Sequence, residues 1–255
     1  MSQFKPIPSL GLRESKTWLE PYSYWPDRPR KKQLLKEDRE AVLRSSPESL
    51  LADEELLELI LLYRDTTKFR DAIVDLKKPL ASVRPTVGPL ELASLLAFED
   101  LCIMLPIDDS YQLAAAAVYS PSNWKLAEKF KQNIAEIHQK VPGFDANMTK
   151  KVDHVFRGLA PDRILERYNW SVYMNPTLYQ PRKLPGKEFY LRIERQTIRK
   201  LERSKGIVFT IGVHVDALEE VLADESIAEE LKKSIDSLPK EVTDYKEMNY
   251  KYDWI

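Results

Sequence analysis

Glycine, cysteine and histidine are all scarce in this chain, and their scarcity excludes several chemistries. The seven glycines cannot form a GxGxxG or P-loop phosphate cradle at any register. A single cysteine, Cys102, can neither form an intrachain disulfide nor hold an iron–sulfur cluster, which needs several thiolates. The three histidines, His138, His154 and His214, form no HExxH zinc motif, and there is no GxSxG nucleophile elbow. The chain therefore either depends on an external cofactor or uses none.

A charge excess and a long apolar run are also missing. Lys and Arg number 39 and Asp and Glu 40, so we expect no nucleic-acid footprint, and we interpret the basic run 28–32 as the solvated start of a helix. No apolar run approaches a membrane span, and residues 1–16 contain no signal-like stretch. Hydrophobic residues make up 43% of 255 positions, enough for a sizeable core. A lone cysteine fits a reducing compartment, so we expect a soluble cytoplasmic protein.

Hydrophobic periodicity predicts an α+β fold. After an irregular, proline-containing lead, the first hundred residues read as helical, with helices opening at Ser46-Pro47 and at Gly88-Pro89. After about residue 100, the hydrophobic repeat changes from the helical to the strand spacing. Further along we expect strands at 101–105, 112–119, 164–173, 189–201 and 206–215, and helices at 124–138, 146–159, 216–223 and 226–238.

The order of two strands, then helices, then three strands is that of a PAS-type sensor domain. Such a domain has a five-stranded antiparallel sheet that holds a ligand against its middle helices. We accordingly predict an N-terminal helical extension (1–97), a PAS-like core (98–215) and C-terminal helices (216–255), integrated into a single domain. Element order alone does not fix a function.

The segment 192–197 places two guanidiniums, a carboxylate and an amide in a predicted strand. Strand alternation puts Arg192, Glu194 and Gln196 on one face and Ile193 and Arg195 on the other. Burying such charges is costly unless they are paired or used. Two interpretations remain open: a solvated edge strand with Arg–Glu pairs, or a functional site.

His138 ends the predicted helix 124–138 and shares a face with Phe130 and Ile134. One interpretation is a core histidine satisfied by a backbone carbonyl, and the other is an axial ligand to a haem between this helix and the sheet. Cys102 and His214 are the fallback ligands, although both fit structural roles.

Six motifs, in this order, give the chain a resemblance to a known family. They are Pro121-Ser122-x-Trp124, Leu126-Ala127-Glu128-Lys129, Ile137-His138-x-x-Val141-Pro142-Gly143, Asn169-Trp170-Ser171, Glu194-Arg195-Gln196-Thr197 and Phe209-Thr210-Ile211. Together they resemble the haem-dependent oxidative N-demethylase α-subunit family, over about residues 10–246.

The resemblance implies a haem-binding PAS fold with haem b held by His138. The implied activity is oxidative removal of a methyl group from a small secondary amine such as dimethylamine, using O2 and releasing formaldehyde. The family's known complex adds reductase subunits that carry FMN, a 2Fe-2S cluster and tetrahydrofolate, with NADPH as reductant. We expect those cofactors on partner subunits only.

In this interpretation Glu194 accepts the amine proton, and Arg195 or Arg192 stabilises negative charge on oxygen at the haem. Asn169 and Trp170 are expected to shape the cofactor cavity. Two alternatives stay open. The first is a haem-binding, gas-sensing PAS-like module without turnover, and the second is an interaction domain whose Arg–Glu strand is only a surface feature.

Overall fold

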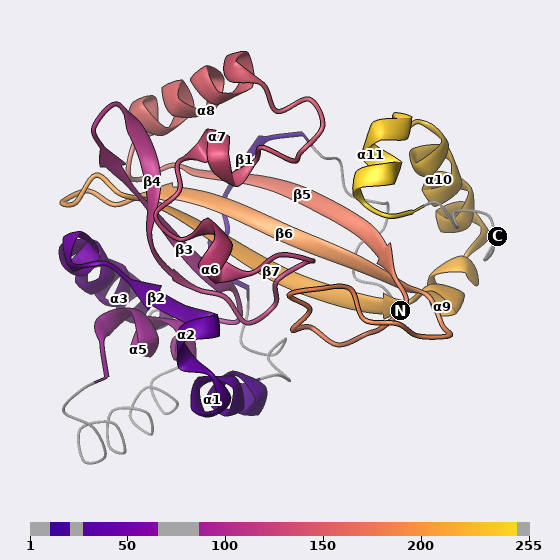
Figure 1. Cartoon of the computed structure of the whole chain (residues 1–255), viewed down its shortest axis with the longest axis horizontal. Coiled ribbons are helices and arrows are strands. Elements are labelled where there is room, and N and C mark those ends of the chain that lie inside the picture. The colour runs from indigo at the N-terminus through magenta and orange to yellow at the C-terminus, as the bar shows by residue number, and fades with distance from the viewer. Residues whose placement is uncertain (1–10, 21–27, 66–86, 249–255) are drawn as a thin grey trace.

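The computed structural model describes residues 11–20, 28–65 and 87–248, and it shows an α+β fold built on one antiparallel sheet (Figure 1). The sheet has seven strands in the order β1-β5-β6-β7-β3-β4-β2. Their bounds are β1 Arg13–Ser15, β2 Leu43–Ser45, β3 Asp100–Ile107, β4 Ser110–Ala117, β5 Ile164–Tyr173, β6 Tyr190–Lys200 and β7 Ile207–Ala217.

The helices precede, interrupt and follow the strands. They are α1 Arg28–Glu37, α2 Arg39–Val42, the 3-10 turn η2 Pro47–Ser49, α3 Leu50–Asp65, α5 Pro89–Leu96, α6 Leu126–Lys129, α7 Ile134–Ile137, α8 Ala146–Gly158, α9 Leu218–Leu222, α10 Glu225–Asp236 and α11 Lys240–Tyr245. None of these helices is long and apolar enough to cross a membrane.

The predicted α+β class is confirmed, and the five predicted strands form the block β5-β6-β7-β3-β4. β5 has the predicted bounds, and β6 and β7 form a long hairpin across the turn at 201–206. Two strands were not predicted. β1 and β2 come from the first hundred residues and pair at opposite edges of the sheet. Each has three residues, too few for an alternating pattern to be recognisable.

The single helix predicted over 124–138 is wrong. The chain instead forms two short helices, α6 and α7, because Phe130 is extended and Lys131 has a positive φ of 66°. The residues between the helices pair with β4, where the Lys131 N–H donates to the Leu113 carbonyl. Asn133 then begins α7 with a capping box that includes Glu136. This Asn-x-x-Glu spacing was the overlooked signal.

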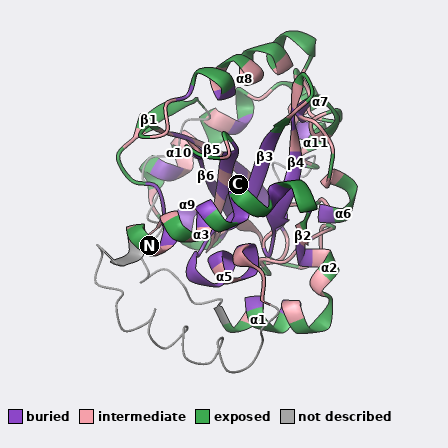
Figure 2. Cartoon of the chain, turned by 90° about the vertical axis from the view of Figure 1, so that its left-hand side faces the viewer, coloured by how far each residue is buried: buried purple, intermediate pink, exposed green. Residues whose placement is uncertain are grey.

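The sheet has two covered faces. We call the face under α6, α7 and α8 the front face; there Ile198 packs near Phe156 of α8. We call the opposite face the back face; α3 and α5 cover one end of it around Ile103, and α9 and α10 cover the other end around Ile193. The central strands are therefore buried between helical layers (Figure 2).

The basic run at the start of α1 is not wholly solvated as predicted. Lys31 is buried, and its Nζ donates to the carbonyls of Ser94, Ala97 and Glu99 at distances of 3.3, 2.9 and 3.0 Å. These carbonyls lie at the C-terminal end of α5, where the helix dipole favours a cation. A buried lysine thus ties α1 to the chain that enters β3.

Candidate functional site

His138 lies at the C-terminal end of α7, under the front face. Its Nδ1 lies 2.9 Å from the Ile134 carbonyl, and its ring stacks on Phe144 with centroids 4.3 Å apart. If Nδ1–H donates to this carbonyl, Nε2 keeps a lone pair, the arrangement common in metal-bound histidines. Burial lowers the pKa of His138, and the charges of Lys129 and Arg167 act in the same direction against the Ile134 hydrogen bond. The neutral, ligating form of the imidazole is therefore favoured.

Arg167 is a front-face residue of β5 that the sequence reasoning missed. It is paired in register with Gln196 of β6. Arg167 Nε and Gln196 Oε1 are buried, and neither has a hydrogen-bond partner in the described part of the chain. Burial lowers the pKa of Arg167, although the charge of Glu194 opposes that shift. Unsatisfied buried polar atoms are rare in folded proteins, which makes these two atoms candidates to bind a ligand or water.

These residues fit a haem. A histidine with one free ring nitrogen supplies an axial ligand, and Arg167 and Gln196 supply unsatisfied polar atoms on the facing strands. Arg167 is close enough to His138 for its charge to lower the histidine pKa. Arg167, Gln196 and the end of α7 lie on the front face of the sheet, so these are the residues that would hold the group.

Glu194 lies on the same face, next to Gln196 along β6. Its carboxylate accepts hydrogen bonds from Asn169 Nδ2 at 3.2 Å, from Gln196 Nε2 at 2.8 Å and from the Ser122 hydroxyl. All three donors are neutral, so they orient the carboxylate without cancelling its charge. Glu194 is 8% exposed, so its carboxylate is a buried hydrogen-bond acceptor to which an ammonium can bind.

Arg192 organises the loops around Glu194. Its Nε donates to Ser122 Oγ at 3.0 Å, and its NH2 donates to the carbonyls of Ser120 at 2.9 Å and Leu178 at 3.0 Å. The guanidinium also lies 5.3 Å from the Tyr173 ring centroid. Burial lowers its pKa, while Glu194 acts in the opposite direction. Arg192 thus holds Ser122 where the serine can donate to Glu194.

A pocket of about 110 Å³ opens beside Glu194. Four of the predicted site residues line it: Asn169, Trp170, Arg192 and Glu194. The structure adds two lysines that the sequence reasoning missed, Lys183 from the loop before β6 and Lys246 just after α11. Neither lysine belongs to a motif quoted above, so only the fold brings them to the pocket.

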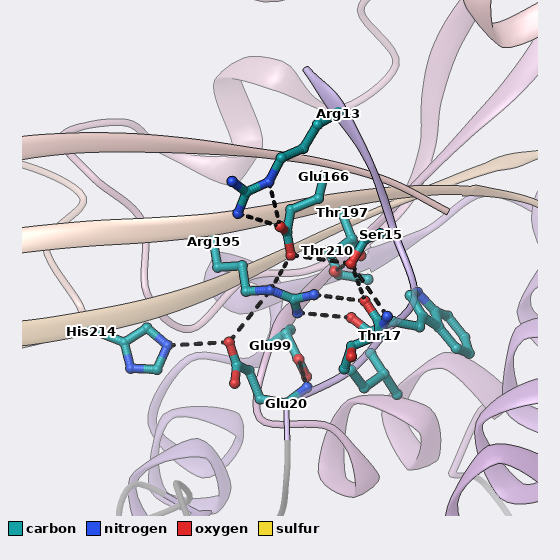
Figure 3. Close-up of polar contacts among 12 residues, drawn as sticks. Arg13, Ser15, Thr17, Glu20, Glu99, Glu166, Arg195, Thr197, Thr210 and His214 are labelled. Carbon is teal, nitrogen blue, oxygen red and sulfur yellow. Dashed lines mark hydrogen bonds and ion pairs between the residues drawn. The ribbon is translucent and has the colours of Figure 1, made fainter. Parts of the chain in front are cut away.

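Arg195 is not among the residues that line this pocket. It points toward Glu166, Thr17 and Glu20 on the back face (Figure 3). Its Nε lies 2.6 Å from Glu166 Oε2, NH1 donates to the Trp18 carbonyl at 3.0 Å, and NH2 donates to the Thr17 carbonyl at 2.6 Å. Glu20 lies 3.7 Å away and also contacts His214 at 3.5 Å. Strand alternation predicted that Arg195 and Glu194 would lie on opposite faces, and this prediction is confirmed.

The two fallback ligands are less suited to bind a metal than His138, for different reasons. His214 is part of the back-face cluster, between Glu20 and the ring of Phe98, whose centroid lies 5.3 Å away. Cys102 is buried in the front-face core, and burial strongly raises the pKa of its thiol. A thiol held in the protonated form is a poor metal ligand. Of the three candidate ligands, His138 has the most suitable surroundings.

A comparison with known families agrees with this geometry. A family model described as haem-dependent oxidative N-demethylase, alpha subunit-like, matches residues 11–253. The chain belongs to this family. The resemblance predicted from the six motifs is therefore confirmed, and the family's description is that of a haem-dependent oxidoreductase and of one subunit of a multi-subunit enzyme.

Proposed function

We propose that this chain catalyses the oxidative N-demethylation of a small secondary methylamine at a haem b whose proximal ligand is His138. The observation that carries this proposal is the family match over residues 11–253. In the balanced reaction, one molecule of the secondary N-methyl amine, one O2, two protons and two electrons give the demethylated amine, formaldehyde and water. Haem, when bound, supplies the oxygen and one-electron chemistry that protein side chains lack.

Glu194 receives the proton of the amine. An aliphatic amine is mostly protonated near neutral pH, as a lysine side chain is, and an ammonium has no lone pair to oxidise. The buried carboxylate of Glu194 binds the ammonium and can accept its proton, while Ser122, Asn169 and Gln196 hold the carboxylate in place. Trp170 and Asn169 line the pocket in which the amine would lie.

We assign to Arg167 the charge-stabilising role that was predicted for Arg195 or Arg192. Arg192 is occupied by Ser122 and three backbone carbonyls, and Arg195 is occupied on the back face. Arg167 lies on the same face as Glu194, and its Nε is unsatisfied. A cation preorganised in a dry site is well suited to stabilise negative charge that develops as oxygen is reduced.

The core that holds these residues supports a PAS-like classification. Strands β3 and β4 precede the helices α6, α7 and α8, and strands β5, β6 and β7 follow them. The sheet order β5-β6-β7-β3-β4 brings the two groups of strands together, with those helices over the front face. β1 and β2 extend this core at its edges.

Electrons must come from a partner. The chain has no recognisable nucleotide cradle and one cysteine, so NADPH, FMN, the 2Fe-2S cluster and tetrahydrofolate would reside on partner subunits. A reductase that delivers two electrons per turnover meets the balance of the reaction. The alpha-subunit description of the family is consistent with such a division of labour.

Two measurements on the purified chain test the proposal. After reconstitution with haem, we expect an intense Soret band and, with O2, dimethylamine and an electron-donating reductase, the release of formaldehyde. Omitting O2 or haem should stop the release. A chain that binds haem and yields no formaldehyde under these conditions would instead be a non-catalytic haem-binding module.

A further inference from the structure

The pocket beside Glu194 has more positive than negative charge. Three cationic side chains line it, those of Lys183, Arg192 and Lys246, against the single carboxylate of Glu194. Arg167 lies nearby on the same face. A simple ammonium ligand would neutralise Glu194 and leave the pocket with an excess of positive charge, because Glu247 offsets only Lys183. Charge complementarity therefore requires a second, negative group on the ligand.

Lys246 reaches the pocket around the edge of β5. Its Nζ donates to Asn169 Oδ1 at 2.9 Å and to the Trp170 carbonyl. Both residues lie on β5 beyond Glu166, the last β5 residue that pairs with β1 in the described part of the chain. A lysine only donates, so it fixes the Asn169 amide with its Nδ2 toward Glu194. Two of the three ammonium hydrogens are thus used within the described residues, which leaves one for a ligand.

Within the described residues, no carboxylate forms an ion pair or hydrogen bond with Lys246 Nζ. Burial lowers the pKa of Lys246 to about 8, although the charge of Glu194 acts in the opposite direction, while Arg167 and Lys183 add to the lowering. A buried ammonium without an ion-pair partner is costly, and an incoming carboxylate would remove that cost.

Lys183 provides a second donor at the same pocket. Its Nζ donates to the Lys246 carbonyl, and it lies 3.5 Å from Glu247 on the exposed side and 5.0 Å from the Tyr173 ring centroid. Glu247 therefore offsets the charge of Lys183 only from outside the pocket. The two lysines and Glu194 place opposite charges within a pocket of about 110 Å³, which suits a ligand of few non-hydrogen atoms.

We propose that the substrate is an N-methyl amino acid, such as N-methylglycine, whose ammonium binds Glu194 and whose carboxylate binds Lys246 and Lys183. The turnover of this ligand rests on the proposed demethylase function, but its binding does not. In the reaction, N-methylglycine, O2, two protons and two electrons from the reductase give glycine, formaldehyde and water. The N–CH3 bond breaks, and the nitrogen keeps its carboxylate-bearing carbon.

Calorimetry on the haem-loaded full chain tests the proposal with three probes. N-methylglycine carries both charges, N-methylglycinamide lacks the carboxylate, and dimethylamine is the simple amine. We expect N-methylglycine to bind about 10- to 100-fold more tightly than either other probe, the range for charge-assisted hydrogen bonds. Equal affinity for N-methylglycine and its amide would overturn the proposal.

Lysine variants locate the carboxylate. Lys246→Met should weaken N-methylglycine binding about 10-fold or more and leave the amide nearly unaffected. Lys183→Met should do the same to a smaller extent, and it keeps the test decisive if Lys246→Met does not fold. Lys187→Met, an exposed change in the same loop, is the matched control. A variant that weakens both probes equally would show that the lysines only hold α11 in place, against the proposal.

Formaldehyde release separates this inference from the proposed function. Selective binding of N-methylglycine without formaldehyde from any amine would contradict the demethylase assignment and uphold the ligand class. Formaldehyde from dimethylamine, with neither binding nor turnover of N-methylglycine, would uphold the demethylase and overturn the ligand class.

Discussion

Buried polar side chains on the two faces of the β5–β6 pair differ in how many of their hydrogen-bonding atoms have partners. On the back face, Arg195 contacts Glu166, two backbone carbonyls and Glu20, so each of its nitrogens has a partner (Figure 3). On the front face, Arg167 Nε and Gln196 Oε1 are buried and find no hydrogen-bond partner among the described residues. A buried arginine whose nitrogens all have partners stabilises the fold, whereas the unsatisfied atoms of Arg167 and Gln196 are candidate binding groups.

The pKa shifts of the two arginines follow this difference. Burial opposes the charge of Arg195, but Glu166 and Glu20 overcome it and raise the pKa. Burial also lowers the pKa of Arg167. The charge of Glu194 acts in the opposite direction but is too weak to reverse the shift, so the pKa falls. One arginine is thus neutralised by its own chain, and the other keeps a charge that a ligand can use.

The largest expected effect is at the front face. His138→Ala should lower haem affinity by more than about 100-fold. Removing a residue that only supports a ligand costs about 10- to 100-fold in affinity, and removing the ligand itself should cost more. The fold should remain, since His138 is only partly buried at a helix end. Soret absorbance and circular dichroism measure the two properties. An unchanged Soret band would contradict the assignment of His138 and leave His214 or Cys102 as the candidate ligand.

At the back face the expected effect is on stability. Arg195→Met leaves Glu166 and Glu20 buried with less compensation, and should lower the free energy of unfolding by about 3 kcal/mol. Chemical denaturation measures this change. The matched control is Arg203→Met, which breaks an exposed pair with Glu58 and should cost less than about 1 kcal/mol.

The Arg195 variant should keep haem binding and formaldehyde release in its folded fraction. A folded Arg195→Met protein that loses demethylation would show that the back-face cluster takes part in the reaction, and the contrast between the two faces would fail.

Sequence reasoning predicted what depends on local periodicity. Alternation placed Glu194 and Arg195 on opposite faces of β6, and β5 has the predicted bounds. It failed where a short polar signal interrupts a pattern, as where Asn133 starts a new helix. His138 was found because it stands in a motif, and its hydrogen bond to the Ile134 carbonyl matches the structural alternative that the sequence left open.

The other pocket residues could not be predicted, because their role depends on contacts between distant segments. Arg167 is two residues from Asn169 on β5, so strand alternation predicts that both lie on the same face. The sequence could not predict that Arg167 Nε has no hydrogen-bond partner among the described residues. Lys246 meets Asn169 across 77 positions of sequence, and nothing near Lys246 indicates this contact. Lys183 is similar, since its partners lie beyond β7.

We expect the charge of Arg167 on the front face to matter for catalysis and not for the stability of the fold. Arg167→Met should lower the demethylation rate about 100- to 1000-fold, the loss typical of removing one preorganised charge-stabilising group. The free energy of unfolding should stay the same or rise, because the substitution removes a buried cation whose Nε is unsatisfied. Arg163→Met, next to β5 and exposed, is the control.

Rates under saturating amine and O2, together with denaturation curves, test both halves of this prediction. Wild-type turnover in Arg167→Met would remove Arg167 from the site. A loss of stability as large as that of Arg195→Met would instead make Arg167 a structural residue like its back-face counterpart.

The smallest expected effect tests whether every unsatisfied buried atom indicates a ligand. Asp53 of α3 lies on the back side of the molecule. Its Oδ1 is buried and has no hydrogen-bond partner in the part of the chain that the structure describes, while Ser45 and Ser49 donate to its Oδ2 at 2.5 and 3.3 Å. Burial raises its pKa to about 6 against those hydrogen bonds. A proton, rather than a ligand, can satisfy this oxygen. The folded state then holds more protons than the unfolded state between pH 4 and 6, so stability falls as the pH rises through that range.

Asp53→Asn should remove this dependence, which is about 2 kcal/mol for a shift of this size. Asp100, whose pKa is also raised to about 6 by burial, should leave a remaining slope of the same sign. Unfolding free energies at pH 4, 5, 6 and 7 provide the measurement, with the exposed Asp109→Asn as control. If Asp53→Asn keeps the full wild-type slope, Asp53 is charged in the folded protein across this range. Its unpartnered oxygen would then require a bound cation or water, as the front-face atoms require a ligand.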